Sequence, residues 1–285
     1  MTINYLCILN NYITQNIVVI FMNYHSDFAD EIKLNKKEYK KQSKKYKKDV
    51  LATSIEILES NNQFNKQKGK YVSIDFKEMF DENQRKEISL ALIDSLNKLY
   101  KIKDEDKVLI VGLGNQKIIA DSLGPKVADK IMVTNHLYTL LKEEDLKRVG
   151  VFTPKVMGQT GLESADLVMA VSKLFKPDII IVIDALATSS IKRINKVIQL
   201  SDTGISPGSG VGNYRKQIDY ETLKIKVLAI GVATVVKASY LLKEEVDIDE
   251  DLILTPKEID EEIEQLSTII AESINKYIHS NYNGM

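Results

Sequence analysis

Two aspartates stand where the sequence pattern predicts the edge of a buried sheet. Asp184 follows a run of β-branched residues in "DIIIVIDALATSS" (178–190), and Asp121 lies in "GNQKIIADSLGPKV" (114–127). A charge at the end of a buried strand is costly, which favours a functional reason for each. Two carboxylates held close together share one proton, so one is an acid and the other a base. Such a pair can deprotonate a water and protonate a leaving amide nitrogen, which is the chemistry of peptide hydrolysis.

Each aspartate also has a purely structural interpretation. Asp121 can cap the helix predicted to begin in "SLGPKV", a contribution of about 1 kcal/mol, and Asp184 can cap the turn that leads to "SSIKRINKV". Ligands of open parallel sheets bind beyond the carboxyl ends of the strands, where both aspartates are expected. We therefore predict that Asp121 and Asp184 are the catalytic halves of one site.

The elements that must position this pair alternate between apolar strands and amphipathic helices. Three continuous apolar runs indicate buried strands: residues 107–114, 178–184 and 224–232. Helical patterns such as residues 164–175 separate them, which predicts a parallel sheet covered on both faces. We expect an α/β fold of three layers, with a mostly parallel sheet and helices on both faces. Residues 50–60 and 70–76 predict a small β-hairpin ahead of it.

Composition excludes several other kinds of site. The single cysteine, Cys7, allows neither an intrachain disulfide nor a cysteine metal site. The three histidines, His25, His136 and His279, are not at metal-ligand spacing, and only His136 is placed to serve a Ser-His-Asp triad. Histidine-driven hydrolysis is therefore disfavoured, and no cofactor is expected.

Charge gives no overall attraction to nucleic acid, because the formal net charge of the 285 residues is −1. Residues 33–48 nevertheless hold nine lysines with two tyrosines among them, a pattern also found in nucleic-acid patches. We interpret this run as a solvated helix or flexible arm, and leave direct nucleic-acid binding open.

Two glycine-rich stretches carry weak signals. "GLGN" (112–115) lacks the third glycine of a dinucleotide fingerprint, and "SPGSGVGN" (206–213) contains no Walker GK[ST]. The second stretch predicts a loop whose backbone approaches a substrate chain or another subunit closely.

The N-terminal 21 residues are moderately apolar, but their longest apolar run, "IVVIF", is far shorter than a membrane span. They lack a basic n-region and a small-residue cleavage site, so a signal peptide is not expected. We interpret Met22 as the true start of translation; a disordered tail is the alternative.

Several motifs occur in an order and spacing that resemble one known family. They are "DSLGPKV", "VMGQTGLESAD", "IDALA", "QLSDTGISPGSGVGNYRK" and "ETL". The chain is similar over residues 26–245 to the spore germination proteases of endospore-forming bacteria. The resemblance implies an endopeptidase that degrades small acid-soluble spore proteins during germination, made as a self-cleaving zymogen. It also implies a homotetramer in the forespore and spore core, no membrane association, a fold like that of hydrogenase maturation proteases, and catalytic aspartates at Asp121 and Asp184.

The resemblance also suggests a processing site. Family cleavage sites place an acidic residue before a large apolar one, then alanine and a nearby acid, as in "SDFADE" (26–31). We predict a cut between Asp27 and Phe28, with Glu31 also bound by the substrate groove. Residues 1–27 would then be an extension and propeptide, and residues 28–285 a single α/β protease domain. The alternative is that "SDFADE" only caps a helix near Glu31.

Five further charged residues fall within the matching motifs and form a second tier of substrate-binding or loop-supporting candidates: Glu163, Asp166, Arg193, Asp202 and Arg215. Arg193 can pair with an acidic substrate residue. The alternative is that these charges tie loops together or bridge subunits.

Departures from the family pattern keep two other functions open. "QKIIAD" replaces a "TPD" stretch, and Thr188 occupies a position at which the family usually has an arginine. Ala233 and Lys237 replace a proline and an acidic residue. A catalytically silent regulatory paralogue is one alternative. Another is a metal-dependent peptidase in which Glu163 or Asp202 joins the two aspartates as oxygen ligands of a hard cation.

Overall fold

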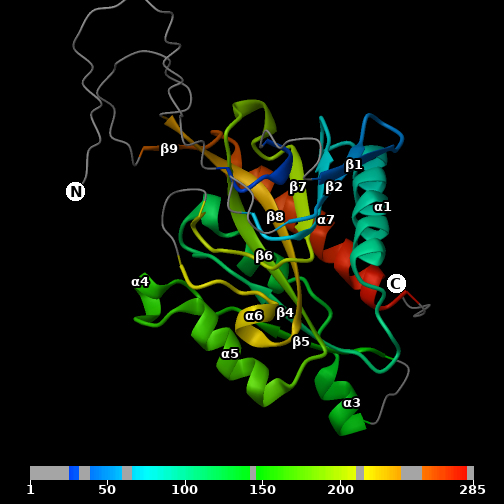
Figure 1. Ribbon diagram of the computed structural model, residues 1–285, viewed down its shortest axis with the longest axis vertical. Coiled ribbons are helices and arrows are strands. Elements are labelled where there is room, and N and C mark those ends of the chain that lie inside the picture. Colours follow the sequence, from blue (N-terminus) through cyan, green and yellow to red (C-terminus); the bar gives the residue numbers. More distant parts are fainter. Residues whose placement is uncertain are drawn as a thin grey trace, which may run out of the picture.

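The computed structural model describes residues 26–31, 39–59, 66–141, 146–209, 215–238 and 252–280. One nine-stranded sheet runs through these residues in the order β1-β2-β3-β7-β8-β6-β4-β5, with β9 paired to β8 (Figure 1). Its parallel part consists of β4 (Lys107–Gly112), β5 (Arg148–Phe152), β6 (Ile179–Thr188) and β8 (Lys226–Lys237). The apolar runs predicted to be buried strands are therefore confirmed as β4, β6 and β8.

The other strands pair antiparallel. They are β1 (Tyr39–Lys45), β2 (Leu51–Ile57), β3 (Gly69–Asp75), β7 (Val197–Ser201) and β9 (Ile253–Leu254). The predicted hairpin is confirmed as β2 and β3. It joins the main sheet because β3 pairs with β7, so the N-terminal strands extend the sheet that carries the two aspartates.

The lysine-rich run differs from expectation where the structure describes it. Residues 39–45 form edge strand β1, whose lysines are exposed, instead of a helix or arm. Charged side chains along an edge strand keep other chains from pairing with it, which is a sufficient structural reason for them. Residues 33–38 lie outside the described part of the chain.

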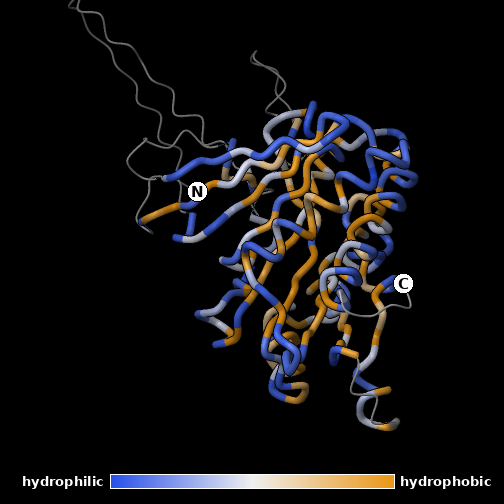
Figure 2. The backbone as a smooth tube through the Cα atoms, turned by 90° about the vertical axis from the view of Figure 1, so that its right-hand side faces the viewer, coloured by the Kyte–Doolittle hydropathy of each residue, from blue (hydrophilic) through white to orange (hydrophobic). Residues whose placement is uncertain are grey.

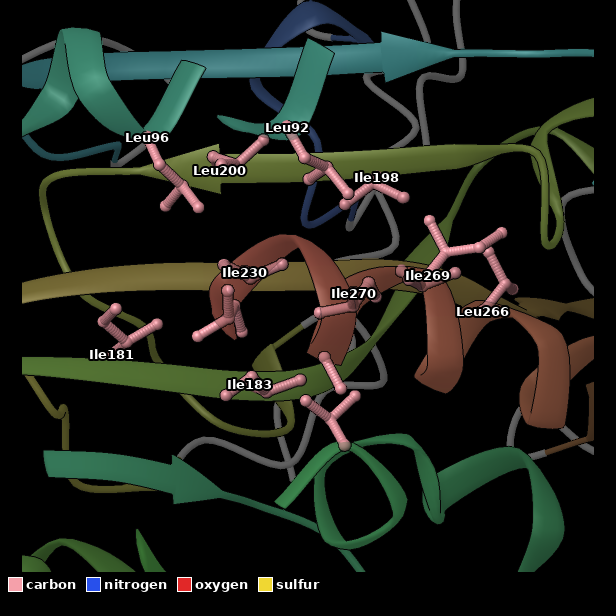
Figure 3. Close-up of a cluster of buried hydrophobic side chains, with 14 of the residues drawn as sticks. Leu92, Leu96, Ile181, Ile183, Ile198, Leu200, Ile230, Leu266, Ile269 and Ile270 are labelled. Atoms are coloured by element: carbon pink, nitrogen blue, oxygen red, sulfur yellow. The ribbon is translucent and has the colours of Figure 1, made fainter. Parts of the chain in front are cut away.

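Helices cover both faces of the sheet, so the predicted α/β class with three layers is confirmed. On one face α1 (Glu82–Leu99), α2 (Leu123–Ala128) and α7 (Ile259–Ile278) pack over the central strands. Figure 3 shows this core, where Leu92 and Leu96 of α1 and Ile270 of α7 meet strand residues such as Ile183 and Ile230. On the other face α5 (Ser164–Phe175) packs against β4 and β6. Burial of these apolar faces is the main stabilising contribution.

The described residues also form three shorter helices: α3 (Asn135–Leu141), α4 (Met157–Thr160) and α6 (Tyr220–Leu223). Leu223 of α6 packs against the core on the α5 side of the sheet. Figure 2 shows hydrophobic residues concentrated along the central strands and hydrophilic residues around them. None of the helices in the described residues is long and apolar enough to cross a membrane.

Strand β6 continues beyond the point at which the sequence pattern places its end. Asp184 was expected to terminate the strand, but β6 runs four residues further, to Thr188. The pairing of β6 with β8 shifts register between Leu186 and Ala187. Small residues permit this continuation, and the added length provides a strand segment to which another chain segment can bind.

Candidate active site

The loop after β4 holds Asp121 against the end of β6. The backbone N–H of Asn115 donates to the Asp121 carbonyl oxygen at 3.0 Å and to its Oδ2 at 2.9 Å. The loop is packed so closely that a Cβ on Gly114 would lie 2.1 Å from the Asp121 carbonyl oxygen. A Cβ on Gly124 would lie 2.6 Å from the carbonyl oxygen of Ile183, the residue before Asp184. Glycine is therefore required at both positions to bring the two aspartates together.

Neither aspartate caps a helix, so the structural interpretation does not account for them. Asp121 lies at the end of the short 3₁₀ helix η2 (Ile119–Asp121), and Ser122 precedes α2 without a side-chain cap. Asp184 is 6% exposed, and its Oδ1 accepts the N–H of its own neighbour, Ala185, at 2.9 Å.

The two carboxyl groups have unequal proton affinities. Burial raises the pKa of Asp184 well above its ordinary value, and the charge of Asp121 and then that of Asp27 raise it further. Burial also raises the pKa of Asp121, while the N–H of Asn115 stabilises its ionised form. Both pKa values are raised, and that of Asp184 more strongly, so Asp184 is the carboxyl group of the two that binds a proton more readily.

A row of paired residues crosses the sheet at Asp184. Asp184 on β6 pairs with Gly231 on β8, and Gly231 pairs with Gln199 on β7. Directly paired residues project to the same face of a sheet, here the face opposite α1 and α7. Gly231 has no side chain, and Leu186 of β6 packs over it: a Cβ on Gly231 would lie 2.4 Å from the Leu186 side chain.

Residues 26–31 occupy this region and run beside the end of β6. The N–H of Asp27 donates to the Ala187 carbonyl oxygen at 3.1 Å, and the N–H of Ala187 donates to Asp27 Oδ2 at 2.9 Å. Ser209, from the predicted glycine-rich loop, donates its hydroxyl to Asp27 Oδ1 at 2.7 Å. One main-chain hydrogen bond and two hydrogen bonds to the Asp27 carboxylate therefore hold the predicted processing segment beside the end of β6.

Phe28 is held in an apolar pocket. Its side chain is 0% exposed and packs with Leu186 of β6, Val197 of β7 and Ala233 of β8. The Arg193 guanidinium lies 4.9 Å from the centre of the Phe28 ring. Because a larger residue at position 233 would fill part of this pocket, the departure from the family pattern at Ala233 bears directly on which side chain fits.

Glu31 is bound by hydroxyl and charged donors. It accepts from Thr188 Oγ1 at 2.5 Å, from Ser189 Oγ at 2.6 Å, from Ser189 N at 2.9 Å and from Arg193 at 2.8 Å. Burial opposes its ionisation, but hydrogen bonds from Ser189, Ser26 and Thr188 outweigh it and leave the pKa of Glu31 below its ordinary value. Thr188, a second departure from the family pattern, is thus one of these donors. Residues 29–31 form the short helix η1 (Ala29–Glu31). The helix that the alternative interpretation places after Glu31 would lie in residues 32–38, outside the described residues.

Arg193 also reaches the segment, whereas the other second-tier residues do not. Its guanidinium makes two hydrogen bonds to Asp30, at 2.8 and 3.1 Å, and one to Asp75 at 3.2 Å. The remaining four tie loops together: Glu163 with Arg215 at 3.8 Å, Asp166 with Lys216 at 2.6 Å, and Asp202 with Lys70 N at 2.8 Å and Lys226 at 3.7 Å. Among the described residues no three histidine, cysteine, aspartate or glutamate side chains are grouped as metal ligands.

The sequence did not reveal several residues that contact the segment. Gln199 stands at the start of "QLSDTGIS", within the stretch that carried the family resemblance, so its place in that motif was a usable signal. Lys66 gave no signal, because it lies in a polar hairpin connection where lysine is ordinary. Ser189 also gave no signal, whereas Ser209 lies in the glycine-rich stretch predicted to approach a substrate chain or another subunit.

Comparison with known proteins decides the family. A family model described as "Germination protease" matches residues 21–249, which include residues 26–31 and both aspartates. The chain belongs to the germination protease family. Its similarity to curated germination proteases extends over most of their length. The protein from Clostridium perfringens strain 13 is 35% identical over 84% of this chain and 88% of its own, and that from Clostridium acetobutylicum is 36% identical over 80% and 84%.

The germination protease of Priestia megaterium is 42% identical over 71% of this chain and 57% of its own. Among solved structures, the chain is similar to the [NiFe] hydrogenase maturation protease HycI from Thermococcus kodakarensis. That similarity has 20% identity and a TM-score of 0.35 over 64% of this chain and 97% of the other. Membership of the germination protease family, predicted from the motifs, is thus confirmed, and the protein is a peptide-bond hydrolase of spore germination.

Proposed function

We propose that this germination protease is an endopeptidase that starts the degradation of small acid-soluble spore proteins. It is made as a zymogen that cuts its own chain between Asp27 and Phe28. One observation carries the proposal: residues 26–31 are bound along the end of β6, beside the two aspartates. Residues 1–27 are then the propeptide, of which residues 1–25 lie outside the described part, and residues 28–285 the protease domain.

Asp121 and Asp184 carry the hydrolysis in this proposal. Ionised Asp121 takes a proton from water as the water oxygen bonds to the carbonyl carbon of Asp27, and the carbonyl electron pair moves onto its oxygen. When that pair returns, the bond to the Phe28 nitrogen breaks and the nitrogen takes the proton of Asp184. The products are a carboxyl terminus at Asp27 and an amino terminus at Phe28. Asp121 now carries a proton taken from the water and Asp184 is ionised, and proton exchange restores the starting state.

The raised pKa values of Asp121 and Asp184 predict that self-processing becomes faster on mild acidification. At high pH both carboxyl groups are ionised and Asp184 has no proton to give. As the pH falls toward their raised pKa values, the singly protonated pair accumulates. At still lower pH Asp121 is protonated as well and the base is lost, so the rate has a maximum.

Substrates in trans would use the same contacts. The pocket that holds Phe28 fits a large apolar residue, and the hydrogen-bond donors around Glu31 bind a carboxylate three residues further along. The acidic, apolar, alanine and acidic pattern expected of spore-protein cleavage sites fits this arrangement. We further propose that the enzyme is a homotetramer that acts in the forespore and spore core.

The test is intact mass over time for the full chain, moved from neutral to mildly acidic pH, with Asp121→Asn and Asp184→Asn alongside. We expect the wild type alone to lose the residues up to Asp27. Processing that chelator abolishes would assign the reaction to a metal instead. No processing, together with no cleavage of a spore-protein peptide by a chain that begins at Phe28, would identify a silent paralogue.

A further inference from the structure

Two side chains donate hydrogen bonds to the carbonyl oxygen of Asp27. Lys66 Nζ lies 3.0 Å from this oxygen, and Gln199 Nε2 lies 3.0 Å from it. Lys66 comes from the connection between β2 and β3, and Gln199 from β7. We infer that Lys66 and Gln199 are catalytic residues that stabilise the negative charge developing on this oxygen during cleavage. The inference rests on the proposed function, because it assigns roles around the bond proposed to be cut.

Gln199 fixes which peptide bond is presented for cleavage, and it also polarises the carbonyl group of that bond. While its Nε2 donates to the Asp27 carbonyl, its Oε1 accepts the N–H of Ala29 at 2.9 Å. One carboxamide therefore holds the main chain on both sides of Phe28. Gln199 is 8% exposed, and a buried amide with both ends bonded has a fixed orientation. This clamp fixes which carbonyl carbon is presented for attack.

The position of the clamp suits the aspartate pair. Gln199 and Asp184 project from one row of the sheet, with only Gly231 between them. Asp27 lies close enough to Asp184 for its charge to raise the pKa of that carboxyl. The Asp27 carbonyl therefore accepts from Lys66 and Gln199 in a segment whose own carboxylate lies near Asp184.

Lys66 contributes a charged hydrogen-bond donor at a partly buried position. Burial lowers the pKa of Lys66, while the carboxylates of Asp27 and Glu31 favour its charged form. Placing an ammonium in such a setting is costly unless it serves a function or has partners. A donor held at the carbonyl oxygen acts more strongly as that oxygen becomes an anion, and losing one such donor slows a reaction about 10²- to 10³-fold. Stabilising the transition state more than the bound segment is what distinguishes this role from simple docking.

The experiment measures self-processing of the full chain at its optimal pH for Lys66→Met and Gln199→Glu. The first removes the charged donor at similar length, and the second keeps the acceptor for Ala29 while removing the donor for Asp27. Lys68→Met and Gln217→Glu are matched controls, because both residues are exposed and neither contacts residues 26–31 in the described structure. Lys66→Arg tests whether another charged donor restores part of the rate.

A second measurement separates chemistry from docking. In the Asp184→Asn background, where the chain is expected to stay intact, hydrogen exchange reports whether residues 26–31 remain bound. We expect Lys66→Met and Gln199→Glu to reduce the processing rate about 10²- to 10³-fold while most of this protection persists. We expect Lys66→Arg to recover part of the rate and both controls to process like the wild type.

Other outcomes would overturn the inference in different ways. Processing of both variants at the wild-type rate would remove Lys66 and Gln199 from catalysis and leave the proposed function standing. Slow processing with full loss of protection would assign them to docking alone. A wild type that neither processes nor cuts peptide would overturn the proposed function, and this inference with it.

Discussion

Asp184 and Gln199 lie in one row of the sheet, and Gly231 is the residue between them. Because neighbouring strands are about 4.8 Å apart, about 10 Å separates the two Cα atoms. The Leu186 side chain covers Gly231 in this row and also packs against Phe28, so the row supports one wall of the Phe28 pocket.

Gly231→Ala tests whether Leu186 must pack directly over a glycine in this row. The added Cβ would lie 2.4 Å from Leu186, whose side chain forms one wall of the Phe28 pocket. Overpacking of this kind costs about 1–3 kcal/mol, and we expect a lower Tm and processing slowed about tenfold or more. Gly158→Ala is the control, because a Cβ there meets nothing within 4 Å. Unchanged Tm and processing in Gly231→Ala would show that the row tolerates a side chain.

Phe28→Ala tests the contribution of the apolar pocket to docking. Because Phe28 is 0% exposed, its truncation should weaken binding of residues 26–31 by about 3 kcal/mol. We expect slower processing and faster hydrogen exchange of this segment, measured in the Asp184→Asn background. Phe28→Leu keeps most of the apolar contact and should process at a rate between the two. Equal rates for all three chains would show that the pocket does not select the residue.

Arg193→Gln tests recognition of the acidic residues after the cut. The guanidinium contacts Asp30 and Glu31 at largely buried positions, and removing one partner of a buried ion pair costs about 3 kcal/mol. This loss corresponds to processing slowed on the order of 100-fold if the contact is fully present in the transition state.

A double-mutant cycle with Glu31→Gln separates the shared contact from other effects. We expect the double variant to lose less than the sum of the two single losses, because each single change leaves the other group unpaired. Lys216→Gln breaks the exposed pair with Asp166 and should change the rate little. Strict additivity of Arg193→Gln and Glu31→Gln would show that the two residues act separately.

Asp184→Asn tests the energetic consequence of the raised pKa. Burial raises the pKa of Asp184 in the folded protein above its unfolded value of about 3.9. Ionisation of this carboxyl therefore destabilises the fold progressively as the pH rises from about 4 through the raised value. Below about pH 4 the group is protonated in both states and the difference disappears.

We expect Asp184→Asn to have a higher Tm than the wild type at neutral pH and to lose that gain as the pH falls to about 4. Thermal unfolding at a series of pH values measures this. To keep self-processing out of the comparison, both chains carry Asp121→Asn. Asp129→Asn, at an exposed position, should change stability by less than about 0.5 kcal/mol. A neutral-pH Tm below that of the parent chain would mean that the charge at Asp184 is compensated in the fold.

The sequence by itself determined the architecture and its main chemical groups. Continuous apolar runs are buried on both sides only inside a covered sheet, so β4, β6 and β8 were predictable from the sequence pattern alone. The motifs around Asp121 and Asp184 identified the germination protease family, which the comparisons confirm. The edge strand β1 was not predictable, because its lysines carry no periodic pattern and its partner is set by the β2–β3 hairpin.

Only the tertiary structure decided which residues meet at the bond between Asp27 and Phe28. Lys66 lies in a different part of the chain from Gln199 and Ser209, and nothing in its local sequence distinguishes it from other polar residues. The register of β6, β8 and β7 places Asp184, Gly231 and Gln199 in one row. Register follows from the packing of whole strands against both helical layers, and no local stretch encodes it. The contacts around residues 26–31 therefore exist only once the sheet has assembled.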